Sequence, residues 1–407
     1  MALEERPMMD PIASTGSHVG RRISLAHVIS SLGIGGAENV LLRLLAGLDE
    51  TRFQSTVISI TGPGPMADPI RALGVPVIAL GSSPRISASA RSMKAIGRTL
   101  RKLQPDIVQT WMYRADILGG CAARLVRRKH VVWGIHAGLP NPEVQPVAER
   151  VALRLGAMLS RHVPERIICC SQTSIDVHTE LGYDTSKMVL IRNGFAFPLI
   201  SSNREELRSE LGIPLEALVV GRPGRFHPQK DYETLFSAIG TLISDRDDVY
   251  LIATGEGITH DNPTLRSLLS ARHLTGHVFL LGPRFDTQAF YEACDVVVST
   301  SYFGEAMPLI LGEAMAAGVP VVTTDIGDSA YLVGDTGRIV PPRSPDELAR
   351  ALNELLSLTT AQRTEMGQLA QKRIATSFNL QAMVKQYSEI YENLATIQDS
   401  GNRSNAS

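Results

Sequence analysis

The sequence predicts an α/β protein with two doubly wound, Rossmann-like domains. Short apolar runs alternate with stretches of helical spacing along most of the 407 residues. This alternation breaks near residues 196–215 and then begins again. Continuous apolar runs are typical of strands buried on both faces of a parallel sheet, and their alternation with helices favours βα units. The chain is also long enough for two domains of roughly 100–200 residues each.

The first half of the chain contains the pattern for a complete domain. Residues 1–21 are polar and are expected to form a loose extension. Expected strands follow at residues 23–30, 55–60, 75–80, 106–111, 131–135, 166–170 and 188–191. Apolar residues three and four positions apart predict helices at residues 37–48, 90–102, 115–126 and 148–159. We therefore assign residues 22–195 to the first Rossmann-like domain.

The second half repeats the pattern after an interruption. Pro198, several serines and a charged run mark residues 196–215 as an interdomain linker. The second domain is assigned to residues 216–375, with strands expected at 218–221, 249–254, 278–281, 295–299 and 319–323. After it we expect a C-terminal helix at residues 376–397, packed back on the first domain, and a polar tail at 398–407.

Charge is divided unevenly along the chain, although the net charge is only -1. Residues 21–200 hold 22 basic and 12 acidic side chains, whereas residues 201–407 hold 17 and 26. Such a division suggests an anionic partner for the first domain alone, although an undirected drift of charge gives the same numbers. Aromatic residues make up only 5%, which disfavours a base-stacking surface for nucleic acid. Acidic lipid headgroups are the preferred partner.

The cysteines and the hydropathy favour a cytoplasmic protein. No two cysteines form a CxxC pair, and the four are Cys121, Cys169, Cys170 and Cys294. We interpret them as buried thiols in a reducing compartment. No run reaches the roughly 18 apolar residues needed to span a bilayer. Arg21 and Arg22 precede an apolar stretch, but its His27 and serines favour a strand over a signal segment.

The most specific segment is SYFGEAMPLILGEAMAAGVP, at residues 301–320, directly after an expected strand. Pro308 suits the first turn of a helix, whose free N–H groups and positive end form an anion site. Glu305 stands at the entrance to this helix. Glu313 lies two turns further on, where a carboxylate can accept hydrogen bonds from ribose hydroxyls. Taken alone, both glutamates also fit ordinary exposed charges.

Two further turns follow expected strands. The segment GRFHPQKD, at residues 224–231, places Arg225 and Lys230 around a turn that enters a helix. Two cations at such a turn suit a diphosphate, although surface residues often show the same pattern. His136 ends the strand expected at residues 131–135, so the fold places it near the interdomain cleft. A purely structural histidine is the alternative.

The first strand-to-helix turn is rich in glycine. Gly35 and Gly36 allow a ligand to approach the backbone closely, although a plain tight turn fits as well. Glu38 occupies the third glycine position of a dinucleotide fingerprint, and no acidic residue ends the second strand, so nicotinamide binding is not expected. Trp111 and Tyr113 end another strand and either face an acceptor or belong to the core. The triplet at residues 245–247 precedes a strand and is interpreted as a solvated turn, so no metal is expected.

These motifs resemble the signature of the family-4 glycosyltransferases, which have the GT-B fold of two Rossmann-like domains facing a cleft. Residues 305–320 are similar to the family's paired glutamates and its EAMAxGxPVV end, and residues 224–231 to its GRLxxxKG clamp. The turn at 255–257 resembles its GxGP turn, and the turn at 35–38 its GGAE loop. The resemblance covers residues 22 to about 395. The sequence departs from it at residues 306–308, where the family has Gly-Phe-Gly or Gly-Phe-Pro.

The resemblance implies transfer of a sugar, with retention, from a nucleotide-diphosphate sugar that is a co-substrate, with no separate cofactor. It assigns sugar positioning and charge stabilisation to Glu305 and His136, the ribose to Glu313, and the diphosphate to Arg225 and Lys230. The remaining positions that it assigns are donor-binding Ala306, Met307, Pro308, Gly255 and Gly257, and the cleft loop of Gly35, Gly36 and Glu38.

The acceptor is expected to be a saccharide or a polyprenyl-linked saccharide, because the sequence is most similar to bacterial enzymes of exopolysaccharide, capsule and lipopolysaccharide assembly. Peripheral contact with the inner face of the cytoplasmic membrane is expected through a set of first-domain residues. This set is Arg85, Arg91, Lys94, Arg98, Arg101, Lys102, Arg127, Arg128 and Lys129. A nucleotide-sugar epimerase, a phosphorylase and an inactive GT-B scaffold remain alternatives.

Overall fold

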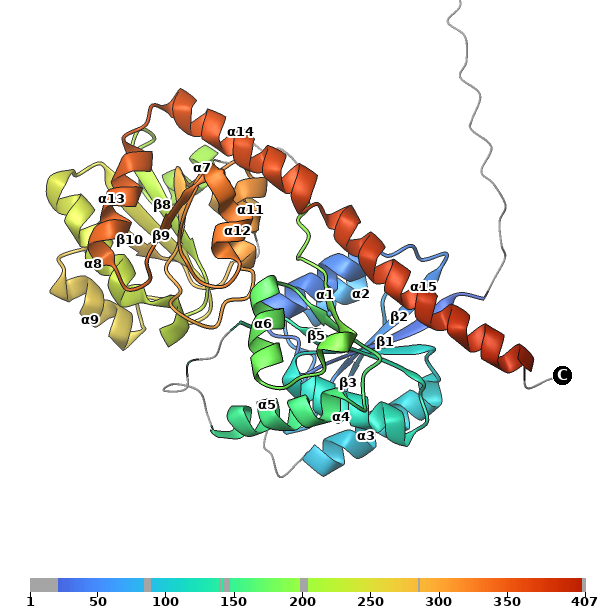
Figure 1. The fold of residues 1–407 in the computed structure, drawn as a ribbon. Coiled ribbons are helices and arrows are strands. Elements are labelled where there is room, and N and C mark those ends of the chain that lie inside the picture. Colours follow the sequence, from blue (N-terminus) through green and yellow to red (C-terminus); the bar gives the residue numbers. More distant parts are fainter. Residues whose placement is uncertain are drawn as a thin grey trace, which may run out of the picture.

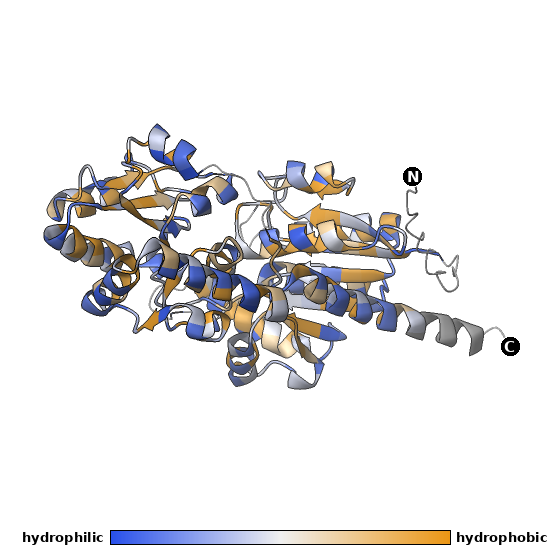
Figure 2. Cartoon of the chain, turned by 90° about the horizontal axis from the view of Figure 1, so that it is seen from above, coloured by the Kyte–Doolittle hydropathy of each residue, from blue (hydrophilic) through white to orange (hydrophobic). Residues whose placement is uncertain are grey.

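The computed structural model describes residues 21–83, 89–138, 141, 147–197, 204–284 and 286–404. These residues form two lobes, each built on a parallel sheet with helices on both faces (Figure 1). Hydrophobic residues concentrate in the strands, while the surrounding helices alternate between hydrophilic and hydrophobic faces (Figure 2). The predicted fold class of two doubly wound domains is confirmed.

Within the described residues, the first sheet has the order β3-β2-β1-β4-β5-β6-β7. Its strands are β1 (Ile23–Ile29), β2 (Phe53–Ser59), β3 (Val77–Ala79), β4 (Ile107–Trp111), β5 (His130–Ile135), β6 (Arg166–Cys169) and β7 (Met188–Leu190). Its helices are α1 (Gly36–Gly47), α2 (Ala67–Ala72), α3 (Ser89–Leu103), α4 (Tyr113–Leu125), α5 (Val147–Ser160) and α6 (Gln172–Glu180). Because strand side chains alternate between faces, one face packs on α1 and the other on α3, α4 and α5.

The second sheet has the order β10-β9-β8-β11-β12-β13 within the described residues. Its strands are β8 (Leu218–Pro223), β9 (Val249–Thr254), β10 (Val278–Leu280), β11 (Val296–Ser299), β12 (Val321–Thr324) and β13 (Arg338–Val340). Helices α8 (Tyr232–Asp245), α9 (Pro263–Ala271) and α13 (Pro345–Leu356) cover one face. The other face carries α7 (Arg204–Glu210), α10 (Thr287–Glu292), α11 (Leu309–Ala316), α12 (Ser329–Val333) and α14 (Thr360–Ser377).

The strand order reverses between β1 and β4 in the first sheet and between β8 and β11 in the second. In doubly wound sheets, ligands bind in the crevice outside the carboxyl ends of strands at such a switch point. The two domains turn these ends toward each other, because Gly138, after β5, donates a backbone hydrogen bond of 3.2 Å to Gly304, after β11. The two crevices therefore meet at the domain interface.

The chain crosses between the lobes at two adjacent places. The Phe195 N–H donates to the Phe378 carbonyl at 2.9 Å, and the Leu380 N–H donates to the Phe195 carbonyl at 3.1 Å. The last helix, α15 (Leu380–Ser404), then leaves the second lobe, where α14 lies, and runs along the first (Figure 1). Its Tyr387 and Tyr391 are buried in the first-domain core beside α1.

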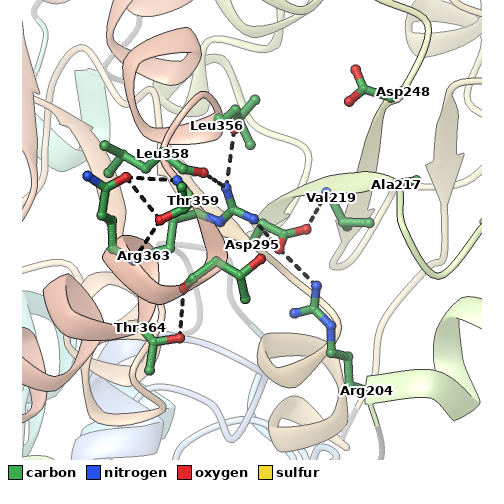
Figure 3. Close-up of polar contacts among 12 residues, drawn as sticks. Arg204, Ala217, Val219, Asp248, Asp295, Leu356, Leu358, Thr359, Arg363 and Thr364 are labelled. Carbon is green, nitrogen blue, oxygen red and sulfur yellow. Dashed lines mark hydrogen bonds and ion pairs between the residues drawn. The ribbon is translucent and has the colours of Figure 1, made fainter.

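A buried carboxylate joins four elements of the second domain. Asp295, just before β11, accepts hydrogen bonds from Arg204 at 2.8 Å, Arg208 at 2.7 Å and the backbone of Val219 at 2.8 Å. Arg363 of α14 lies 3.7 Å away and also donates to the carbonyl groups of Leu356 and Leu358 (Figure 3). Burial acts to raise the pKa of Asp295, but the adjacent arginines outweigh it and lower this pKa.

The secondary structure differs from the expected elements in three places. Helix α7 lies inside the segment 196–215, because Leu207 and Ile213 bury their side chains in the second-domain core. Strand β13 was not expected, because its three residues are too few to give a clear period in the sequence. Helix α15 begins at Leu380, after Asn379 caps the Ala382 N–H at 2.7 Å, and continues to Ser404 through the expected polar tail. The expected extension, apart from Arg21, and residues 198–203 lie outside the described residues.

Candidate functional site

Glu305 and Lys230 form a buried ion pair at the carboxyl edge of the second sheet. The Lys230 ammonium contacts the Glu305 carboxylate, and the Ser301 hydroxyl donates to the same carboxylate oxygen at 2.8 Å. The Glu305 side chain is only 12% exposed and the Lys230 side chain only 17%. Burial favours the neutral form of Glu305, but Lys230 and Ser301 outweigh it and lower the pKa of this carboxyl. Burial also lowers the pKa of Lys230, partly offset by Glu305. Each group therefore stays charged because its oppositely charged partner lies beside it.

Arg222 adds a third charge that sequence reasoning missed. It lies at the end of β8, is fully buried, and donates to the carbonyl groups of Pro223 and, at 3.2 Å, Lys230. Its guanidinium also lies 5.2 Å from the centre of the Tyr232 ring. Its charge helps to lower the pKa of Glu305. The only signal in the sequence is an arginine within an otherwise apolar strand.

Glu313, on α11, is held from two sides. Its carboxylate accepts from the guanidinium of Arg43 on α1 and, at 2.6 Å, from the hydroxyl of Tyr291. Arg43 also donates to the Gly194 carbonyl at 3.3 Å and lies 5.3 Å from the centre of the Phe195 ring. The Arg43–Glu313 pair thus links the first domain to the second. Sequence reasoning found Glu313 but not Arg43, which stands between leucines on α1 and gives no signal of its own.

His136 follows β5, as expected, on the first-domain side of the interface. Its ring stacks on that of Trp111, with centroids 5.2 Å apart. Neither ring nitrogen has a hydrogen-bond partner among the described residues. Burial lowers the pKa of His136 to about 4, so the imidazole is neutral at pH 7. A neutral ring stabilises negative charge only through a hydrogen bond.

The loop at residues 304–308 is enclosed by both domains. An added Cβ on Gly138 would lie 1.9 Å from the Glu305 carbonyl, and one on Gly327 would lie 2.4 Å from it. Ala306, Met307 and Pro308 are buried. Pro308 is the N-cap of α11 rather than its first residue, because its ψ of 119° is extended. No described residue accepts a backbone hydrogen bond from Ala306 or Met307, so these N–H groups are available to an anion.

Arg225 is exposed at the mouth of the second-domain crevice. The loop that carries Arg225 packs tightly on the loop after β9, since the Phe226 N–H donates a hydrogen bond of 2.7 Å to the Glu256 carbonyl. Gly255 has a φ of 144°, and an added Cβ there would lie 2.4 Å from the Gly224 carbonyl. Gly257, with a φ of 75°, lies beside Phe226. These two glycines therefore hold the Arg225 loop in position.

The glycine-rich turn of the first domain faces the same region. Gly35 is the N-cap of α1, and an added Cβ on Gly35 would lie 2.5 Å from the Glu38 carboxylate. Burial raises the pKa of Glu38, and the charge of Arg225 opposes this effect. Because Glu38 belongs to the first domain and Arg225 to the second, this interaction acts across the cleft. Gly36 is exposed at the start of α1.

Asp328 closes the interface at a point that no sequence motif indicated. Its carboxylate accepts from the backbone N–H groups of Gln172 and Thr173, at 2.9 and 3.0 Å, and from the Thr173 hydroxyl at 2.8 Å. A second-domain acid therefore caps the first-domain helix α6, where it also meets the positive end of the helix. Nearby, the Asn193 amide donates to the Met307 carbonyl at 3.2 Å.

Other expectations concern the core and the membrane. Trp111 and Tyr113 are buried, which decides between their two interpretations in favour of the core. Cys169, Cys170 and Cys294 are buried, and Cys121 is partly buried; all four are free thiols. Among the described residues, no three His, Cys, Asp or Glu side chains gather as metal ligands. None of the described helices is long and apolar enough to cross a bilayer.

Comparison with known protein families identifies the family to which this chain belongs. The family described as Glycosyltransferase Family 4 matches residues 34–196, and Glycosyl transferases group 1 matches residues 217–358. The two matches cover the two Rossmann-like domains and the loops described above. The chain belongs to the group 1 glycosyltransferases of family 4. It is therefore a retaining glycosyltransferase of the hexosyltransferase type that uses a nucleotide-sugar donor.

This glycosyltransferase is similar to known enzymes at low sequence identity, over most or about half of its length. It is 25% identical over 91% of its length to the UDP-Gal:alpha-D-GlcNAc-diphosphoundecaprenol alpha-1,3-galactosyltransferase of Escherichia coli, covering 97% of that enzyme. It is 34% identical to the D-inositol 3-phosphate glycosyltransferase of Corynebacterium urealyticum, but over only 48% of each chain. The structure of Anabaena HepE with UDP-glucose superposes with a TM-score of 0.81 at 23% identity, over 91% of this chain and all of HepE. That likeness supports the GT-B fold.

Proposed function

We propose that the nucleotide-sugar donor binds where Glu305, Lys230 and Arg222 meet the start of α11. The observation that carries this proposal is the concentration of positive charge at this point. The buried Lys230 ammonium contacts the Glu305 carboxylate, and the buried Arg222 guanidinium helps to lower the pKa of the same group. The N–H groups of Ala306 and Met307 donate to no backbone carbonyl of the described residues. A diphosphate supplies the missing negative charge and hydrogen-bond acceptors. Arg225, exposed at the cleft mouth, contacts the outer phosphate.

The remaining contacts follow from the same placement. Glu313 holds the ribose, while Arg43 and Tyr291 orient its carboxylate. Glu305 and His136 lie on opposite sides of the interface and contact the transferred sugar. His136, which is neutral, donates or accepts a hydrogen bond there. The leaving diphosphate is stabilised by Lys230, Arg225 and the start of α11 without a metal.

The proposed donor base is uracil. The E. coli relative is named for UDP-Gal, and HepE was solved with UDP-glucose. The proposed acceptor is a polyprenyl-diphosphate-linked saccharide, as in the name of the E. coli relative, within cell-surface polysaccharide synthesis. The basic first domain would bring the enzyme to the inner face of the cytoplasmic membrane, where such an acceptor lies.

Calorimetry with UDP, GDP, ADP and their sugar conjugates tests the donor site, first in EDTA and then with Mg²⁺. We expect micromolar binding of UDP ligands in EDTA, weakened about tenfold or more in Glu313→Ala. Glu354→Ala is the matched control, because Glu354 is a 61% exposed carboxylate paired with Arg338 far from the cleft. No binding to any nucleotide would overturn the proposal and favour an inactive scaffold.

A second assay separates transfer from epimerisation. With a polyprenyl-diphosphate-linked saccharide, the transferase releases UDP in a one-to-one ratio with a longer glycolipid, and the new linkage keeps the anomeric configuration of the donor. An epimerase instead changes the UDP-sugar when no acceptor is present. That result, read by NMR of the nucleotide sugar, would replace the proposal.

A further inference from the structure

Helix α5 exposes a stripe of large apolar side chains. The stripe consists of Val147, Val151, Leu155 and Met158, which are 65%, 57%, 38% and 67% exposed. Their spacing of three and four residues places them on one helix face. The opposite face, with Leu153 and Ala157, is buried in the first-domain core. The apolar stripe therefore points away from the protein, and single exposed apolar residues, which are common, do not account for it.

Basic residues border this stripe. At 100° per residue, Arg150 and Arg154 lie along one edge of it, and Arg161 follows directly after the helix. All three are exposed. The one acidic residue of α5, Glu149, lies further round the helix, toward the buried side. A row of arginines beside a row of apolar side chains is the pattern of a helix that lies in the interface of an anionic bilayer.

The neighbouring helix continues the basic surface. Helices α3 and α5 both pack on α4, and Figure 1 shows all three on the side of the first domain away from α15. Helix α3 has no acidic residue, and its exposed basic residues are Arg91, Lys94, Arg98, Arg101 and Lys102. Arg127 and Lys129 after α4 are also exposed. Arg85 lies outside the described residues.

We infer that the α5 stripe inserts into the headgroup region of an anionic bilayer while α3 rests on its surface. This inference rests on the proposed function and names the element that inserts. A second copy of the chain fits less well, because a twofold interface pairs a patch with itself and would bring the arginines of the two copies together. Helix α5 begins eleven residues after His136, so insertion holds the cleft near a lipid-linked acceptor.

Tryptophan fluorescence tests insertion directly. The native Trp111 and Trp133 are fully buried, so a new tryptophan in Met158→Trp reports its own surroundings. With vesicles of 70% phosphatidylcholine and 30% phosphatidylglycerol, we expect a blue shift and quenching by brominated lipid. Leu369→Trp is the control, since Leu369 is 54% exposed on α14 of the other domain. Equal responses in the two variants would overturn the inference.

Sedimentation with the same vesicles separates the two contributions. We expect the Val151→Ser/Met158→Ser variant to bind at least about fivefold more weakly at all salt concentrations. The Arg98→Glu/Arg101→Glu variant should lose mainly the salt-sensitive part of binding. Leu369→Ser should bind like the wild type. Equal binding to pure phosphatidylcholine would contradict the anionic surface.

Two readouts distinguish the remaining outcomes. Light scattering without lipid is expected to show no concentration-dependent dimer, and a dimer abolished by Val151→Ser/Met158→Ser would assign the stripe to a second copy instead. UDP binding by the same variant should match the wild type. If the wild type binds UDP but not vesicles, this inference fails and the proposed function stands. If it binds vesicles but no nucleotide, the proposed function fails on its own.

Discussion

At the scale of single residues, the donor site is a balance of buried charges. Lys230 and Glu305 are each stable as ions because the other is present, and Arg222 shifts the balance toward positive charge. Removing one partner of such a pair costs far more than the pair contributes. The site is therefore sensitive to each member.

Lys230→Ala tests this balance. It leaves the Glu305 carboxylate buried with fewer partners and removes a phosphate contact, so we expect at least about a hundredfold loss of kcat/KM. Lys372→Ala, at an exposed lysine on α14, is the control. Steady-state transfer with a polyprenyl-linked acceptor is the measurement. Activity within threefold of the wild type would remove Lys230 from the site.

Asp116 is a second single residue with a measurable effect, because its protonation makes the stability of the fold depend on pH. It is buried under β4, accepts a hydrogen bond from Thr110, and burial raises its pKa to about 7. The folded state therefore binds this proton more tightly than the unfolded state, whose carboxyl has a pKa near 3.9. Asp116 thus costs stability as pH rises from about 4 to about 7, and the cost is constant above that range.

Asp116→Asn removes this pH dependence. Between pH 5 and pH 8 we expect the wild type to lose up to about 3 kcal/mol relative to the variant. The measurement is urea unfolding at both pH values, with the difference in unfolding free energy compared between the two proteins. A difference that does not change with pH would show that Asp116 titrates normally.

At the scale of elements, Asp295 determines how α7 and α14 attach to the second sheet. Arg208 of α7 is 1% exposed and relies on this carboxylate together with three carbonyl groups. Asp295 thereby connects α7, β8 and α14 to the start of β11. One side chain therefore joins the first and last helices of the domain to its sheet.

Asp295→Asn should therefore destabilise the second domain by about 3–5 kcal/mol, because it leaves Arg208 buried without its counter-ion. Asp248→Asn is the matched control: Asp248 also pairs with an arginine, Arg246, but is 44% exposed, so its loss should cost less than about 1 kcal/mol. Thermal unfolding followed by circular dichroism compares the two. Equal shifts in Tm would contradict the role of Asp295.

At the scale of the whole molecule, several contacts between described residues join the domains beside the two chain crossings. They include the backbone bond from Gly138 to Gly304, the Arg43–Glu313 pair, the Asn193–Met307 bond and the capping of α6 by Asp328. The capping of α6 by Asp328 does not involve a residue that we assign to the donor, whereas Met307 is one of those residues. Asp328 can therefore be changed to test domain closure without removing a proposed ligand contact.

Asp328→Ala removes three interdomain hydrogen bonds and an unusual helix cap. We expect the ligand-free variant to open, with a radius of gyration about 1 Å or more above the roughly 22 Å of a compact chain of this length. Saturating UDP should restore the wild-type value if the nucleotide bridges both domains. Small-angle X-ray scattering measures both states, and an unchanged ligand-free radius would show that the crossings alone maintain closure.

Sequence reasoning reached the parts of the site that lie in one local segment. Glu305, Glu313 and Lys230 each lie within a recognisable motif that follows a strand, and the structure places each at the interface or beside it. Arg222, Arg43 and Asp328 were missed because their significance depends on distant partners. Glu313 is 270 positions from Arg43, and Asp328 is 156 positions from Gln172.

The sequence by itself determined the two-domain α/β fold, the order of most strands and helices, and the side of each sheet on which the ligand loops lie. These features follow from local backbone geometry, since apolar period and turn chemistry act over a few residues. Only the tertiary structure decided that Trp111 lies in the core beside His136 and which charges meet across the cleft. Those outcomes depend on the packing of segments far apart in the chain, because a charge or ring has no partner until the sheets are assembled.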